Sequence, residues 1–222
     1  MSLIDLITGN AGNQVASEAE NKFGITKNQV IALLAVAAPL VISYLKKKSQ
    51  ENSEEADALN NALDKDHDGS ILNDPSQAAA RQQEGGSILD HIFGGQKATV
   101  ENQLSQNTGI SMDKIGPIMA MLAPLIMGYI GKQKQSSGVT SGGGLGDLLG
   151  GILGGAQSQA QAEPSNTLND ILGSVLGGGS QANAGSNPLN DILGSVLGGG
   201  NQQQQSQGGL GGLLGSILGG GK

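Results

Sequence analysis

The sequence predicts an all-α protein: a helical bundle made of two tandem similar helical units, followed by a glycine-rich low-complexity tail. Residues 2–47 align without a gap with residues 87–132 at a constant offset of 85, and 13 of these 46 positions are identical. No alternation of apolar and polar residues, the pattern of a half-buried strand, precedes residue 135. Because 26 of the 38 glycines follow Lys134, we divide the chain into a duplicated domain, 1–134, and a tail, 135–222.

The first unit, residues 2–48, begins with a short apolar segment. A polar helix follows, and Gly24 is a natural C-cap for it. Thr26 and Gln29 have the spacing of a capping box, so we expect a second helix through the apolar run 30–45. The second unit, 87–134, repeats this order with Ser111 in the place of Thr26 and the apolar run 115–130. Their common order favours a pseudo-twofold arrangement.

The two apolar runs are hydrophobic on every side, which is typical of a helix that is fully buried or lies in lipid. Each run has 16 residues and contains a proline, Pro39 or Pro124, at which we expect the helix to kink or break. A membrane-spanning helix needs about 20 apolar residues, but lysines follow both runs and suit a membrane flank. We favour two central core helices and keep a membrane-associated protein as the alternative.

Between the units, the insert 53–84 holds the most chemically specific motif of the chain. Residues 64–75 read DKDHDGSILNDP, with carboxylates at alternate positions, then glycine, then an apolar residue. This is the first part of an EF-hand loop, in which oxygen ligands surround Ca²⁺ and glycine permits a sharp turn. The candidate metal ligands are Asp64, Asp66, Asp68, Ser70 and Asp74.

The twelfth position of the loop departs from the EF-hand pattern. An EF-hand has a bidentate carboxylate there, whereas this chain has Pro75, with Asp74 one place early. The loop therefore either binds Ca²⁺ weakly through a shorter geometry or is an Asp-rich turn whose side chains cap neighbouring helices. His67 lies at a position that we expect to face solvent.

These features together resemble a known bacterial family. They are the Ser-apolar-apolar-Asp start, the Gly-Ile turn into a Pro-containing helix, and the D-x-D-G-S loop at Asp66–Ser70. The chain resembles the family catalogued as domain of unknown function 937 over residues 1–134, and loosely in the tail. The resemblance implies a helical fold and a bacterial origin, and it carries over no catalytic residue.

The tail contains four short apolar islands. Each has apolar residues at positions i, i+3, i+4, i+7 and i+8, which form one face of a helix. Isolated helices of about nine residues are marginal in water, so we expect the islands to fold only when docked. We call them islands one to four; they are Leu145–Leu153, Leu168–Leu176, Leu189–Leu197 and Leu210–Leu218.

Composition restricts the function. The net charge of −7 without a basic patch argues against nucleic-acid binding. The chain has no cysteine and two histidines, and no spacing suggests a catalytic triad or a phosphate-binding loop. We therefore expect a non-enzymatic, cytoplasmic protein that self-associates through its tail islands, with weak Ca²⁺ binding as a modulator. A weakly membrane-active or aggregating tail is the alternative.

Overall fold

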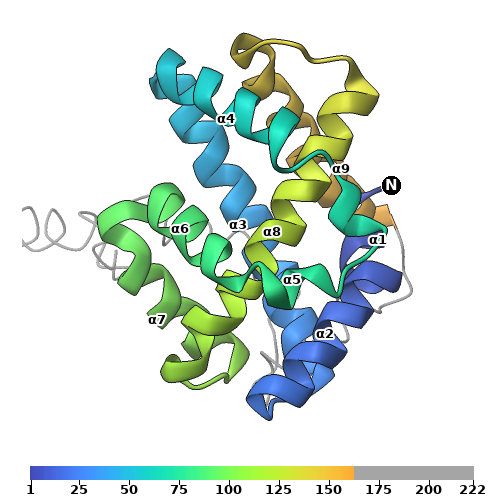
Figure 1. Cartoon of the computed structure of the whole chain (residues 1–222), viewed down its shortest axis with the longest axis vertical. Coiled ribbons are helices and arrows are strands. Elements are labelled where there is room, and N and C mark those ends of the chain that lie inside the picture. The colour runs from blue at the N-terminus through green and yellow to red at the C-terminus, as the bar shows by residue number, and fades with distance from the viewer. Residues whose placement is uncertain (163–222) are drawn as a thin grey trace, which may run out of the picture.

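The computed structural model describes residues 1–162, with side chains as far as Ala156; residues 163–222 lie outside the described part. Residues 1–162 form helices and turns and contain no strand, which confirms the all-α class (Figure 1). The helices are α1 (Leu3–Thr8), α2 (Asn10–Phe23), α3 (Lys27–Glu51), α4 (Ser53–Lys65), α5 (Gln77–Ala80), α6 (Gln82–Phe93), α7 (Lys97–Thr108), α8 (Met112–Ser137) and α9 (Leu145–Ala162).

Helices α3 and α8 form the centre of the bundle. Every residue of α3 from Val30 to Leu45 is buried, as is every residue of α8 from Ile118 to Gly131. Both helices are longer than the apolar runs, because polar residues extend them at each end. A T-shaped contact between the rings of Tyr44 and Phe93, whose centroids are 4.9 Å apart, joins α3 to the end of α6.

Of the kink or break expected at the central prolines, the break is wrong, and the kink stays a prediction. Helix α3 continues through Pro39, and α8 continues through both Pro117 and Pro124. A proline inside a helix removes one backbone hydrogen bond and adds a steric conflict. Here the surrounding helices bury both central prolines, and this packing maintains the helix on either side of each one.

The helix ends follow the sequence signals closely. Gly24 and Gly109 end α2 and α7 in the left-handed conformation, with φ values of 62° and 68°. The Thr26–Gln29 capping box at the start of α3 is formed in both directions. Gly24 and Gly109 lie 85 residues apart. The same offset separates Lys27 and Met112, the first residues of α3 and α8.

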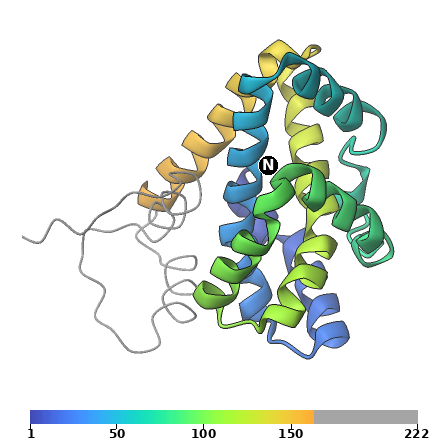
Figure 2. The same ribbon diagram turned by 90° about the vertical axis from the view of Figure 1, so that its left-hand side faces the viewer.

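The remaining helices cover the central pair. Figure 1 shows α6 crossing α8, and Figure 2 shows α9 running beside α3; α9 also contacts α8. Helix α6 approaches α8 closely at Gly85, where an added Cβ would lie 1.7 Å from the backbone oxygen of Ala120. A side chain at position 85 is therefore incompatible with this packing.

Gly85 and its neighbour Gly86 give a matched test of this contact. We predict that Gly85→Ala destabilises the protein by about 1–3 kcal/mol, the usual effect of overpacking. Gly86 lies in the same helix with open space around its Cβ position, so Gly86→Ala should stabilise by about 0.5–1 kcal/mol. Thermal unfolding of both variants measures the difference, and equal melting temperatures would contradict the close approach of α6 to α8.

Candidate functional site

The last turn of α4, which contains Asp64, and the loop that follows it hold the five predicted metal ligands. Several of these residues contact other protein groups. Asp64 forms an ion pair with Lys134 of α8. The Asp68 carboxylate accepts a hydrogen bond from the Ser70 backbone N–H at 2.9 Å. The Asp74 carboxylate accepts hydrogen bonds from the Ser76 hydroxyl and, at 3.0 Å, from the Gln77 amide. Three of the carboxylates thus have protein partners.

These hydrogen bonds stabilise the charged forms of two carboxylates. The Ser70 backbone N–H lowers the pKa of Asp68, and the Ser76 hydroxyl and Gln77 amide lower the pKa of Asp74. Within residues 1–162, no group of three or more Asp, Glu, His or Cys side chains lies close enough together to hold a metal ion. The arrangement has the features of a capping turn, and Ca²⁺ binding by this loop stays a prediction.

Glycines of α8 allow the loop to lie directly on that helix. An added Cβ at Gly128 would lie 2.4 Å from the Ile71 side chain, and one at Gly131 would lie 1.7 Å from the backbone oxygen of His67. Gly69, with a φ of 93°, makes the turn that brings Ile71 into the core. The loop is therefore held in place by the hydrogen bonds of its carboxylates and by packing against α8.

His67 and Lys134 differ from the sequence-based expectation. His67 was expected to face solvent, but its side chain is only 5 % exposed, because the loop folds back onto α8. Lys134 was expected to follow the apolar run as a flanking charge; it is buried, and its Nζ donates to the backbone oxygen of Asn60 at 3.3 Å. Neither environment can be read from local sequence, since His67 depends on the contact of the loop with α8 and Lys134 on the contact of α8 with α4.

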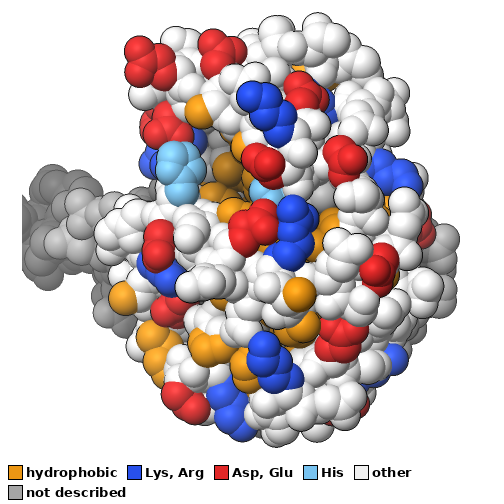
Figure 3. Space-filling view, in the orientation of Figure 1, with side chains coloured by type: hydrophobic (Ala, Val, Ile, Leu, Met, Phe, Trp, Pro, Cys, Tyr) orange, Lys and Arg blue, Asp and Glu red, His pale blue; other side chains and the backbone are white. Residues whose placement is uncertain are grey.

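A cleft of about 350 Å³ opens between α3, α4 and α6. We call it the histidine cleft, and Figure 3 shows it as a hollow with hydrophobic side chains at its floor and histidines beside it. Two histidine–glutamate pairs lie beside it. His91 Nε2 lies 2.8 Å from a Glu55 carboxylate oxygen, and His67 Nε2 lies 3.5 Å from a Glu84 oxygen. The apolar floor and walls are Leu45, Ala58, Leu59, Ala62, Ile88, Ile92 and Met127.

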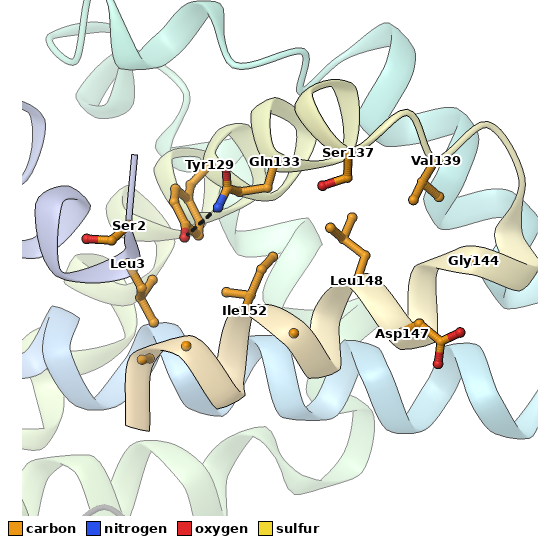
Figure 4. Close-up of a pocket in the computed structure, with 13 residues that line it drawn as sticks. Ser2, Leu3, Tyr129, Gln133, Ser137, Val139, Gly144, Asp147, Leu148 and Ile152 are labelled. Atoms are coloured by element: carbon orange, nitrogen blue, oxygen red, sulfur yellow. Dashed lines mark hydrogen bonds between the residues drawn. The ribbon is translucent and has the colours of Figure 1, made fainter. Parts of the chain in front are cut away.

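A second groove, of about 570 Å³, lies between α1, α8 and α9, and we call it the α9 groove. In Figure 4, Tyr129 and Gln133 of α8 line one side of this α9 groove, and Leu148 and Ile152 of α9 face them. The Gln133 amide donates a hydrogen bond to the Tyr129 hydroxyl at 3.2 Å.

The two grooves are lined by residues at matching positions of the aligned segments and just beyond them. Ser2 and Leu3 line the α9 groove, and Ser87 and Ile88, 85 residues later, line the histidine cleft. Lys48 of α3 and Gln133 of α8 correspond in the same way. Helix α4 lines the histidine cleft beside α3, and α9 lines the α9 groove beside α8.

Helix α9 begins with the first tail island. Leu145 and Leu149 are fully buried, and Ile152 is 7 % exposed. Gly150 faces α3, since an added Cβ there would lie 3.3 Å from the Nζ at the end of the Lys46 side chain. Island one is thus docked on the domain of its own chain, whereas islands two to four lie outside the described residues.

A family model described as a bacterial protein of unknown function (DUF937) matches residues 5–133. The chain belongs to this family. The match confirms the resemblance drawn from the sequence. It covers α3, the loop after α4 and most of α8, and it ends before α9. No curated protein and no solved structure matches the chain.

Burial lowers the pKa of His67, and this shift predicts a pH-dependent stability. Folding favours the neutral imidazole, so the unfolded chain binds the proton more readily below its ordinary pKa of about 6.5. The stabilisation is present above that pH and decreases as the pH falls below it. The other charged groups around the ring are Glu84, Arg81, Asp66 and Asp68; the carboxylates oppose the shift and Arg81 adds to it.

We predict that His67→Gln flattens the decrease in melting temperature between pH 7 and pH 5. His91→Gln is the matched control, because His91 is 61 % exposed. Thermal unfolding across this pH range measures both variants. An unchanged slope for His67→Gln would contradict the burial of a neutral imidazole.

Proposed function

We propose that this DUF937 protein is a non-enzymatic structural protein that self-associates through its tail islands. The observation that carries the proposal is the docking of island one, whose leucines at 145 and 149 are buried on the domain. An apolar helix of this composition gains most of its stability from packing rather than from intrinsic helix propensity. Further islands with the same apolar face need a comparable apolar surface.

The islands match α9 position by position. Islands two and three are the identical nine residues LNDILGSVL, and island four is LGGLLGSIL. Each retains the five apolar positions of LGDLLGGIL in α9 and the glycine equivalent to Gly150, the residue that faces the Lys46 side chain of α3. Three such segments in one chain give the multivalency by which weak contacts add up to stable assembly.

We also propose that the two helical units, 2–48 and 87–134, arose by duplication. The alignment at an offset of 85, the matching helix boundaries and the corresponding grooves all support it. In this interpretation α9 is the counterpart of α4, and the EF-hand-like loop is an insert that only the first unit carries.

A membrane-associated protein is the second candidate, because α3 and α8 are long and apolar enough to cross a bilayer by length and composition. In each helix, 83 % of the most apolar window is buried within the bundle. Insertion therefore requires the other helices to move away from both. A chain that needs detergent to remain in solution would favour this candidate over self-association.

The islands are tested in the full chain by adding one charge to each apolar face. We predict that the triple variant Leu172→Asp, Leu193→Asp and Leu214→Asp shifts the protein to monomer in light scattering coupled to size-exclusion chromatography. The control adds the same three charges off the apolar face, as Ser174→Asp, Ser195→Asp and Ser216→Asp, and should retain the oligomer. Equal masses for the two variants would refute assembly through the islands.

Ca²⁺ modulation is tested on the same instrument. Because Asp64 is paired with Lys134, Ca²⁺ must displace an ammonium group to recruit it, which is consistent with weak binding. We predict that the oligomer mass changes only at millimolar Ca²⁺, the range of weak calcium sites. This Ca²⁺-dependent change should be absent in Asp68→Asn. A mass that is the same with excess Ca²⁺ and with chelator would remove Ca²⁺ from the proposal.

A further inference from the structure

The surface of α3 on which α9 packs is already covered by α9, a segment of the same chain. A tethered helix competes at an effective concentration in the millimolar range, well above that of segments on other molecules. An island that arrives from a second copy therefore needs an apolar surface that is open. Within residues 1–162, the histidine cleft and the α9 groove are two such surfaces.

Charge distinguishes the two surfaces. Among the described residues that line the α9 groove, Asp147 is the one charged side chain. Islands two and three carry an aspartate at the equivalent position, Asp170 and Asp191, so docking there would bring like charges together. In the histidine cleft, each carboxylate already has a basic partner: Glu55 lies 3.8 Å from Lys48, and Glu84 lies 3.0 Å from Arg81.

The walls of the histidine cleft suit an incoming helix. Ala58 and Ala62 lie on one face of α4, one turn apart, and both line the cleft. Their small side chains allow a helix axis to approach at the short end of the usual 8–10 Å range. Met127 lies at the floor, where its unbranched side chain can adapt to a leucine.

We propose that the histidine cleft is the site at which a tail island of a second copy docks, with Leu168–Leu176 or its identical copy Leu189–Leu197 as the occupant. The leucine face of the island covers the apolar floor between α4 and α6, and its first-turn aspartate lies towards Lys48 at the rim. This inference rests on the proposed function, because it specifies where the islands bind.

Cysteine cross-linking tests this contact in the full chain, which has no cysteine of its own. One preparation carries Ser87→Cys at the mouth of the cleft, and a second carries Ser174→Cys in island two. We expect the mixture, treated with a short bismaleimide, to give a covalent heterodimer that mass spectrometry identifies by its linked peptide. Ser111→Cys, at the exposed start of α8, is the control partner and should give background cross-linking only.

A second pair of variants tests the cleft without cysteines. Ala58→Arg places a long charged side chain in the cleft, and Asn61→Arg adds the same side chain to α4 at an exposed position that does not line it. We expect Ala58→Arg to raise the concentration needed for half-maximal assembly by about tenfold or more, as for a hot-spot residue. Asn61→Arg should leave it unchanged.

The outcomes separate this inference from the proposed function. If the oligomer depends on the islands but Ser174→Cys links to Gln133→Cys in the α9 groove rather than to Ser87→Cys, the cleft assignment is overturned while self-association stands. If the islands produce no oligomer, the proposed function fails first. An assembly that Ala58→Arg and Asn61→Arg weaken equally would also overturn the cleft assignment.

Discussion

The fold depends on the need to bury two helices that are apolar on every side. A helix with one apolar face can lie at a surface, but α3 and α8 have no polar face over most of their length. Each of the other α-helices contacts this pair: α6 lies on α8, for example, and α9 lies on α3, while the loop after α4 lies on the end of α8. The glycines at 85, 128 and 131 are the points at which these covering elements approach most closely.

This requirement also explains why the first tail island belongs to the packed body. The family match ends at residue 133, and the sequence placed Leu145 in a glycine-rich tail. In the structure, island one, at the start of α9, covers a side of α3 that would otherwise be exposed. A sequence rich in glycine can form such a helix because the packing of Leu145 and Leu149 offsets its low helix propensity.

Local chemistry made much of the fold predictable from the sequence. The Thr26–Gln29 capping box and the C-cap at Gly24 gave helix ends that the structure confirms, and the uniform apolar runs gave the core. The uninterrupted helix at Pro39 and the burial of His67 were not predictable in this way, since both are decided by tertiary packing. For the same reason, alternate carboxylates at 64, 66 and 68 were visible in the sequence, whereas the pairing of Asp64 with Lys134 was not.

The central claim is that each island folds when, and only when, it is docked. Hydrogen–deuterium exchange of the full chain at low and high protein concentration tests this claim most directly. The account predicts that amides of Leu145–Leu153 are protected at both concentrations, while those of Leu168–Leu176 and Leu189–Leu197 become protected only at the higher one. Protection of islands two and three that does not change with concentration, or an unprotected first island, would contradict it.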